Sequence, residues 1–526
     1  MLADANLRFA LPCREMRSGM EIDMEKSIEN RNENGGRSSK QQKNAAGRLA
    51  VILLVTVECV FLGLLIYTHL LPASYVALVG VMFLLVAILV TALLWASRNK
   101  AKQIVGYVLT FLMLLLLIPG GNYIYRTTRM LFNISNVQTE VTLLGVYVRA
   151  EDGAVTLQDT AEYAYGILEE LDRESTDEAL QELEEELETT LRVQEFHGIL
   201  EIVDGLLRGQ VDAILLNQTY LDIAGDMEGY EELSTLVREI GVRDVEKVVE
   251  NATPGAQENV NSEEEETEKD VFVIYFSGID SRSSKLVAKS RSDANLLAVV
   301  NANTHKVLLI STPRDYYVSL SIAGGAEDKL THASIYGIEC SVETMEMLYD
   351  IDIDYYGRMN FYGFIDIIDA LGGITVWSDY EFDSMNHPGH HFTVGANEVD
   401  GDGALAFARE RFSYAEGDIQ RGRNQLEIIR AVIDKAASPA ILSNYTSLLD
   451  SVEGSFETNV PYYEIAYLVR KQLTSGAEWE VTTYNVSGTG ASRKPYSLSQ
   501  NAYVMIPDQA SVDQAKEMIA KILAGE

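Results

Sequence analysis

Three long apolar runs in the first quarter of the chain place the strongest constraint on its fold. They extend roughly over residues 49–71, 75–95 and 104–125, and each has about the 20 residues that a membrane-spanning helix needs. The first run begins too far from Met1, and is too long, for a typical cleaved signal peptide. We therefore expect three transmembrane helices within residues 48–125, the first of them retained as an anchor.

The distribution of basic residues predicts the orientation of these helices. Cytoplasmic segments next to membrane helices are enriched in Lys and Arg. Such residues precede the first run and separate the second from the third: Arg37, Lys40, Lys43, Arg48, Arg98, Lys100 and Lys102. We expect residues 1–47 to form a cytoplasmic tail. After three crossings, the chain from Arg126 onward is expected outside the cell, as part of a multi-pass membrane protein.

The overall charge limits which partners this exterior part attracts. The chain of 526 residues has a formal net charge of −36, which argues against nucleic acid as a partner. An anionic ligand would need a local basic site. Of the three cysteines only Cys340 follows the apolar runs, so the exterior part has no internal disulfide framework.

Composition divides the exterior part into segments. Residues 136–250 combine a strand-like run, an acidic helix with Leu180, Leu183, Leu187 and Leu191 on one face, and a turn at Gly209 into a buried strand, which predicts an accessory α/β domain. Residues 251–269 are acidic and poor in large apolar side chains, as in a flexible linker.

A second core begins near residue 270. Strand-like runs at 271–276 and 374–377, a strand pair around 301–305 and a helix at 361–371 alternate along it. This order predicts an α/β domain over residues 270–474, with a central mixed β-sheet covered by helices. Residues 475–526 are expected to extend this domain, either by completing its sheet or as a small appendage.

Charged residues stand at the ends of the expected strands and in a later helical region. The set comprises Asp280, Arg282, Arg291, Asp293, Arg314, Asp315, Arg409, Arg411, Asp418, Arg421 and Arg423, followed by Gln425. Ligands of helix-covered sheets gather at strand ends. Any single Arg and Asp pair is most simply a structural ion pair. So many basic groups at element ends in an acidic chain instead predict one binding site.

The residue types in this set indicate phosphate chemistry. The arginine fork donates paired hydrogen bonds to phosphate oxygens, so several arginines together would bind a diphosphate. Asp280 and Asp293 offer oxygen ligands for Mg²⁺. Arginine, with Arg314 foremost, and the metal would stabilise charge at phosphorus, while Asp315 and Asp418 are the candidate bases for an incoming hydroxyl. By contrast, we interpret His387-Pro-Gly-His-His391 as an ordinary polar loop, because the sequence places no Cys or well-spaced carboxylate beside it.

The order of these motifs resembles the LytR-CpsA-Psr (LCP) family of cell-wall glycopolymer transferases over about residues 271–436. The matching segments are Gly278-Ile-Asp280-Ser-Arg282, Arg291-Ser-Asp293, Ser311-Thr-Pro-Arg314-Asp315, Lys329-Leu-Thr-His-Ala333, Asp369-Ala-Leu-Gly-Gly373, Asp400-Gly401 with Ala404-Leu-Ala-Phe-Ala-Arg-Glu-Arg411, and Asp418-Ile-Gln-Arg421 followed by Gln425. Each segment alone is weakly specific, whereas this order is strongly so.

The resemblance implies a function and roles for individual residues. It implies transfer of teichoic acid, capsule polysaccharide or a related polymer from a polyprenyl pyrophosphate carrier to peptidoglycan, outside the membrane. It also implies that Asp280 and Asp293 bind magnesium and that a larger set holds the pyrophosphate: Arg291, Arg314, Arg409, Arg411, Arg421 and Gln425. Where many members have Arg-Gln, this chain has Asn424-Gln425 after Arg423, so the role of Arg423 is open.

Other functions and one further site stay open at this stage. A polyprenyl chain needs an apolar channel, for which helices at 361–371 and 426–433 are candidates, although ordinary core packing is the simpler explanation of their apolar faces. The same charged residues would suit a pyrophosphatase that uses water as the acceptor. A non-catalytic envelope sensor or polymer-binding protein, with residues 136–250 as its ligand module, is the alternative of a different class.

Overall fold

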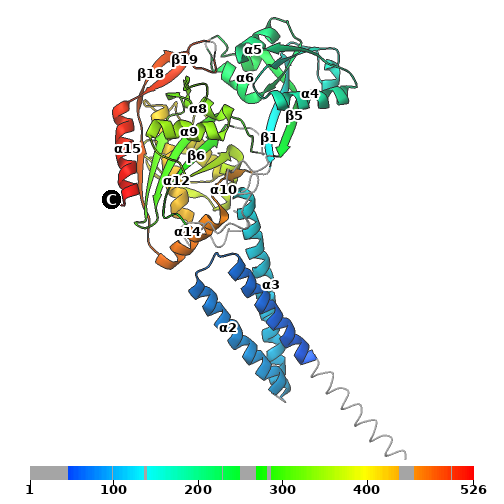
Figure 1. Ribbon diagram of the computed structural model, residues 1–526, viewed down its shortest axis with the longest axis vertical. Coiled ribbons are helices and arrows are strands. Elements are labelled where there is room, and N and C mark those ends of the chain that lie inside the picture. Colours follow the sequence, from blue (N-terminus) through cyan, green and yellow to red (C-terminus); the bar gives the residue numbers. More distant parts are fainter. Residues whose placement is uncertain are drawn as a thin grey trace, which may run out of the picture. The chain divides into compact units, whose positions relative to one another are not determined.

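The computed structural model describes residues 46–96, 99–135, 139–227, 229–248, 268–280, 286–436, 455–498 and 500–526. Almost all of the expected cytoplasmic tail and linker, and Arg282, lie outside these described residues. The chain divides into two compact units, Met1–Arg126 and Thr127–Glu526 (Figure 1). Each unit is described by itself.

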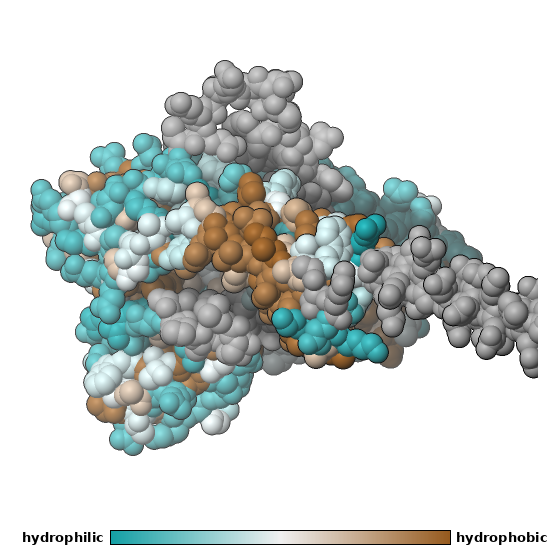
Figure 2. All heavy atoms as spheres, turned by 90° about the horizontal axis from the view of Figure 1, so that it is seen from below, coloured by the Kyte–Doolittle hydropathy of each residue, from teal (hydrophilic) through white to brown (hydrophobic). Residues whose placement is uncertain are grey.

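Three helices of the first unit are long and apolar enough to span a membrane. The candidate spans are Ala46–Tyr67, Ala73–Trp95 and Lys100–Arg129. The second contains α2 (Ala73–Thr91), with Pro72 at its N-cap, and the third lies in α3 (Lys100–Ser135), which continues through Pro119. Their surfaces are rich in apolar side chains, seen as the brown area of Figure 2. The expected spans are confirmed, although the first helix ends at Tyr67 rather than near residue 71, and α3 is longer than expected.

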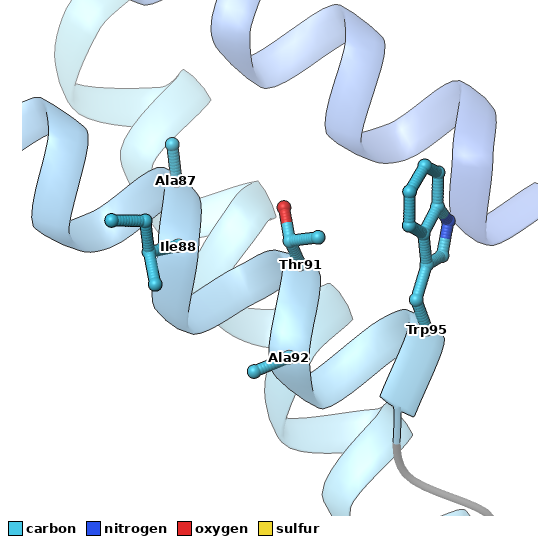
Figure 3. Close-up of a pocket in the computed structure, with 5 residues that line it drawn as sticks. All are labelled: Ala87, Ile88, Thr91, Ala92 and Trp95. Carbon is cyan, nitrogen blue, oxygen red and sulfur yellow. The ribbon is translucent and has the colours of Figure 1, made fainter.

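A cavity of about 500 Å³ lies on the surface of the second span. Its lining residues are Ala87, Ile88, Thr91, Ala92 and Trp95 (Figure 3). The Trp95 ring lies 5.8 Å from the guanidinium carbon of Arg48 on the first helix. This cavity has no charged side chain in its lining, so it lacks the groups that a pyrophosphate would need.

Residues 139–248 form a five-stranded mixed sheet with helices. Its strand order is β3-β2-β4-β1-β5. The strands are β1 (Thr139–Arg149), β2 (Ala164–Leu168), β3 (Arg192–Phe196), β4 (Ala213–Asn217) and β5 (Val237–Val248). The helices are α4 (Arg173–Leu187), α5 (Ile199–Leu207), α6 (Gln218–Gly225) and α7 (Leu233–Leu236). We refer to residues 139–248 as the accessory region.

The sequence prediction for the accessory region needs one correction. Leu191 was expected on the same helix as Leu183, but α4 ends at Leu187 because Glu188 takes a left-handed conformation with φ of 51°. Both leucines nevertheless contribute to one buried apolar cluster with Tyr165 and Leu215. Every residue of β4 is buried, as the turn at Gly209 into a buried strand predicted.

The second sheet has six strands in the order β16-β11-β6-β7-β8-β17. They are β6 (Val271–Ile279), β7 (Ser292–Asn301), β8 (Lys306–Thr312), β11 (Tyr355–Asn360), β16 (Phe456–Thr458) and β17 (Glu480–Asn485). β11 pairs with β6 and β17 with β8 in parallel, whereas β7 is antiparallel to both β6 and β8. The expected α/β fold with a central mixed sheet is therefore confirmed.

Side chains of β7 alternate between two apolar layers, one on each face of this sheet. Leu297 and Val299 pack in a cluster with residues of α9 (Ile338–Tyr349) and α15 (Gln509–Ala524). Leu296 and Ala298 pack on the other face with Leu426 of α12 (Asp418–Ala436). The apolar side chain of Leu426 thus belongs to the core, as one of the two sequence interpretations held.

The C-terminal part completes the second sheet. β17 pairs with β8 from Glu480↔Lys306 to Asn485↔Ser311, and α15 covers the adjoining face. Between β17 and α15 in the sequence, β18 (Gly488–Arg493) and β19 (Ala502–Pro507) form a separate antiparallel pair. Of the two alternatives for residues 475–526, the structure therefore has the one in which they extend the sheet.

The accessory region packs directly on residues that follow β6. The backbone N–H of Ala288 donates to the carbonyl of Val141 at 2.9 Å, and Lys289 Nζ lies 3.0 Å from Asp172 Oδ1. Ile335 and Leu498 also join the apolar cluster of the accessory region. These contacts bring its helix α6 near the strand ends described next.

Candidate active site

Four charged residues meet at one edge of the second sheet. β6 and β8 run in the same direction and β7 runs between them in the opposite one, so the ends of β6 and β8 and the start of β7 share this edge. Asp280 follows β6, Arg291 and Asp293 lie at the start of β7, and Arg314 follows β8. The strand directions therefore bring together residues that are separated in the sequence.

Ion pairs connect these residues to one another and to the accessory region. Arg291 Nη2 donates to Asp280 Oδ2 at 3.1 Å, and Arg291 Nη1 donates to Asp226 Oδ2 at 2.6 Å. Arg314 Nη1 donates to Asp293 Oδ1 at 2.8 Å. Both arginine side chains are nearly buried, 11% and 12% exposed, so their charges are poorly screened by water.

Asp315, next to Arg314 in the sequence, pairs with two cations. Lys329 Nζ lies 3.2 Å from Asp315 Oδ1, and Arg314 Nε lies 3.6 Å from Asp315 Oδ2. Lys329 belongs to β10 (Glu327–Lys329), which pairs with β9 (Tyr317–Ser319) beyond β8. Lys329 therefore pairs from a strand, whereas Asp315 pairs from the turn between β8 and β9.

Helices α11 (Gly401–Arg409) and α12 supply the remaining charges. Arg421 Nη2 donates to Asp418 Oδ2 at 3.2 Å, and Arg411 Nη1 lies 4.0 Å from Asp418 Oδ1. Arg409, at the end of α11, lies over the ring of Phe361 at 4.4 Å and contributes to the potential at Asp280. Gln425 is half-buried and follows Asp418 and Arg421 on the same helix face, at i+7 and i+4.

The residues that interact in this way form what we call the charged cluster. It consists of Asp280, Arg291, Asp293, Arg314, Asp315, Lys329, Arg409, Arg411, Asp418 and Arg421. Arg423 lies elsewhere: its side chain is half-exposed, pairs with Glu416 at 2.5 Å, and lines a separate cleft with Trp377 and Arg430. Arg282 lies outside the described residues.

The electrostatics of the cluster favour an anionic ligand. Burial would raise the pKa of Asp293, but Arg314, Arg421 and Arg291 hold that pKa well below its usual range. Burial lowers the pKa of Arg421, and the neighbouring Arg314 lowers it further. Buried cations that repel one another would gain from the two or more negative charges of a pyrophosphate.

Two carboxylates of the cluster suit a hard cation. Burial raises the pKa of Asp280, and the charge of Asp293 raises it further. Paired carboxylate oxygens that disfavour each other's charge are the donor type that Mg²⁺ prefers. Asp280 and Asp293 thus have the donor type that the expected magnesium ion would need, and each also accepts a hydrogen bond from an arginine.

Two polar atoms of the cluster make no hydrogen bond within the described residues. They are Arg314 Nε and Asp418 Oδ1, both buried. A buried polar atom without a hydrogen bond costs roughly 1–3 kcal/mol. One is a donor of the type suited to a phosphate oxygen and the other an acceptor of the type suited to a hydroxyl proton; each lies beside an opposite charge, Asp315 Oδ2 at 3.6 Å and Arg411 Nη1 at 4.0 Å.

A buried Asp, His and Ser group nearby has a different role. Asp328 Oδ1 lies 2.7 Å and Ser497 Oγ 2.9 Å from the same ring nitrogen, His332 Nδ1. Catalytic triads use the two ring nitrogens separately, one for the acid and one for the nucleophile. The backbone N–H of Ser497 also donates to Asp328 Oδ2 at 2.7 Å, so this group fastens the segment before β19 to β10.

Two residues of this region were missed from the sequence. Lys329 stands in the quoted run Lys329-Leu-Thr-His-Ala333, and a lysine at the start of an apolar helix segment was the available signal. Asp226 gave no signal, because its contact with Arg291 crosses from the accessory region to the second sheet.

The Asp226 contact predicts how the accessory region affects anion binding. Asp226 Oδ2 occupies Arg291 Nη1, which an anion would also use. Because the Asp226 side chain is half-exposed, we expect Asp226→Asn to increase the affinity for inorganic pyrophosphate only modestly, by about two- to fivefold. Calorimetric titration measures it, with Asp204→Asn, which removes a carboxylate paired with Arg208, as the control. Equal affinities of the two variants would contradict the prediction.

Comparisons with known proteins agree with this architecture. Residues 241–521 match the model of the LytR_cpsA_psr family. The polyisoprenyl-teichoic acid–peptidoglycan teichoic acid transferase TagU of Bacillus cereus strain AH820 is 35% identical over 205 residues, which are 39% of this chain and 65% of that protein. The TagU of Oceanobacillus iheyensis is 32% identical over 247 residues, 46% of this chain and 73% of that protein.

A solved structure is also similar. The crystal structure of B. subtilis TagV has 29% sequence identity and a TM-score of 0.41, covering 49% of this chain and 99% of that chain. The chain thus spans slightly less than two thirds of the B. cereus relative, and the match to the family model covers more than half of the chain. Together with the ordered motifs at the sheet edge, this match shows that the chain belongs to the LytR_cpsA_psr family.

Proposed function

We propose that this protein transfers an anionic cell-wall glycopolymer from a polyprenyl pyrophosphate carrier to peptidoglycan, on the outer side of the membrane. The observation that carries the proposal is the buried charged cluster at one sheet edge, where arginines and carboxylates from the ends of β6 and β8, the start of β7 and helix α12 come together. The TagU relatives are named for teichoic acid transfer to peptidoglycan, which supports this class of substrate and acceptor.

Substrate binding would use the arginines of the cluster. The nearly buried guanidinium groups of Arg291, Arg314 and Arg421 would bind the pyrophosphate. Arg409, the last residue of α11, and Arg411, two residues beyond it, would add to this set. Gln425 would donate an amide hydrogen on the same face of α12. Asp280 and Asp293 would hold magnesium, which when bound supplies positive charge to phosphate oxygens.

The transfer step would replace one phosphorus–oxygen bond by another. The acceptor hydroxyl oxygen bonds to the phosphorus attached to the glycan, and the bond from that phosphorus to the bridging oxygen breaks. Polyprenyl phosphate leaves, and the hydroxyl proton passes to a carboxylate. The buried arginines stabilise the negative charge on the phosphate oxygens during this step.

Asp418 is better suited than Asp315 to accept the proton. Asp418 Oδ1 makes no hydrogen bond among the described residues. Burial would raise the pKa of Asp315, but Arg314 and Lys329 hold that pKa below its ordinary value, so this carboxylate is a weak base. We therefore assign Asp418 as the base and Asp315 as a residue that positions Arg314 and Lys329.

An assay of the full chain with a polyprenyl-pyrophosphate-linked glycan, magnesium and peptidoglycan tests the proposal. A covalent glycan–peptidoglycan product, with polyprenyl phosphate released in equal amount, is the expected result. Phosphate release without a linked product would instead indicate a pyrophosphatase. Tight binding of the carrier with neither product would indicate a polymer-binding or sensor protein, and either outcome would overturn the transferase proposal.

A further inference from the structure

Two histidines and an aspartate converge away from the charged cluster. His387 and His390 lie in the segment between β13 (Phe382–Asp383) and β14 (His391–Phe392), and Asp402 lies in the first turn of α11. His387 Nε2 lies 3.0 Å from Asp402 Oδ1, and His390 Nε2 lies 2.8 Å from Asp402 Oδ2. The sequence offered no carboxylate partner for these histidines, and the fold supplies one.

The backbone positions all three side chains for this convergence. Gly389, with φ of 111°, allows the tight turn that places the His387 and His390 ring centroids 5.3 Å apart. On the other side, Asp400 caps α11 through Gly403 N, and Gly401 N donates to Asp369 Oδ1 at 2.7 Å. A Cβ at position 401 would lie 2.4 Å from the Ile365 carbonyl oxygen, so the first turn of α11 is held closely against α10 (Phe361–Ala370).

We propose that His387, His390 and Asp402 form a binding site for a zinc ion. One ligand atom from each residue lies within 4.8 Å of the others. Tetrahedral zinc with bonds of about 2.0–2.1 Å needs neighbouring ligand atoms about 3.3 Å apart, so small side-chain rotations close the set. Three protein ligands leave the fourth position to water.

The chemistry of the donor set selects zinc over magnesium. Imidazole nitrogens bind borderline ions such as Zn²⁺, whereas Mg²⁺ prefers oxygen ligands throughout. With zinc bound, both rings are neutral, and the three lone pairs that already converge are all used.

The zinc ion would attach the segment between β13 and β14 to α11 at a second point. At the far end of this helix, Glu410 Oε2 accepts from Met385 N at 2.6 Å, and Asn386 Nδ2 donates to the Arg409 carbonyl at 2.6 Å. At the near end, only the two His–Asp402 contacts join the segment to the helix among the described interactions. Zinc would make this second attachment rigid and so support the position of Arg409 at the other end of α11. This supporting role rests on the proposed function, whereas the proposal of zinc binding does not rest on it.

Metal titration of the full chain tests the site. The protein, purified with a tag that contains no histidine, is stripped with a chelator and titrated with Zn²⁺ in excess magnesium, which competes for the carboxylates of the charged cluster. We expect one zinc ion per chain, and an absorption spectrum typical of tetrahedral coordination when Co²⁺ replaces it. His387→Ala, His390→Ala or Asp402→Asn should each weaken zinc binding at least about tenfold.

His391→Ala is the matched control for these variants. His391 is adjacent in sequence but pairs with Asp383 at 2.9 Å and Glu381 at 3.6 Å instead, so its loss should leave zinc affinity unchanged. Metal-free thermal unfolding of each variant shows whether it folds. A wild-type chain that takes up no more zinc than a folded His387→Ala/His390→Ala/Asp402→Asn variant would overturn the proposal. Because no substrate is present, this result is independent of the transferase assay.

Discussion

Arg314→Ala is expected to reduce glycan transfer by about 10²–10³-fold, the effect of removing one preorganised donor to a charged transition state. Arg314 is nearly buried, donates to Asp293 and adjoins Asp315, and its Nε makes no hydrogen bond within the described residues. It therefore links the candidate metal ligand, the second carboxylate and the substrate position. The rate of linked product formation with magnesium measures the effect.

Loss of Arg314 also leaves Asp293 without its hydrogen-bond partner, so the alanine variant needs controls for folding. Arg314→Lys keeps the charge but loses the planar fork, and we expect a folded protein with strongly reduced transfer. Arg430→Ala removes an exposed arginine on α12 that pairs with Glu427, and should change transfer by less than about twofold. Folded Arg314 variants with wild-type rates would reject the assignment of this site.

Glu457→Ala is expected to lower the free energy of unfolding by about 3–5 kcal/mol, because it removes one partner of a buried ion pair. Arg358 on β11 and Glu457 on β16 face each other across the strands, with Nη2 and Oε2 2.7 Å apart and both side chains at most 8% exposed. Arg358 Nη1 also donates to the Ala288 carbonyl at 2.7 Å. The pair thus connects a short edge strand to the segment that precedes Arg291.

Urea unfolding, followed by tryptophan fluorescence and circular dichroism, measures this loss. Glu398→Ala on the exposed side of β15 (Gly395–Val399) is the matched control, and it should change stability by no more than about 0.5 kcal/mol. A Glu457→Ala variant as stable as this control would show that the buried pair does not stabilise the sheet.

Much of the fold follows from local sequence patterns. The 20-residue apolar runs predicted the spans, and the short apolar runs near 271 and 301 predicted strands of a mixed sheet. The pairing of strands was harder to predict, because β17 pairs with β8 although most of the second core separates the two strands in the sequence. Such pairing depends on side-chain packing over both faces of the sheet, which a single sequence does not display.

The composition of the charged cluster was partly predictable. Residues at strand ends, such as Asp280 and Arg314, follow from the shared edge of neighbouring strands. Arg423 was included in the expected set, but it stands at i+5 from Asp418, away from the helix face that holds Arg421, and pairs with Glu416 instead. Asp226 and Asp402 were not predictable as partners, because each meets its partner across elements whose packing only the fold determines.

The position of β17 has a consequence for folding during synthesis of the chain. As the polypeptide emerges from the ribosome, the outer edge of β8 is made early, whereas the strand that pairs with it comes last of the six. Until then β8 exposes unpaired backbone groups that invite intermolecular pairing. Asp315, which lies just after β8, gains one of its hydrogen bonds from a strand made later still, because its carbonyl accepts from the backbone N–H of Met505 in β19. We therefore expect newly made chains to be prone to intermolecular pairing through β8 during this interval.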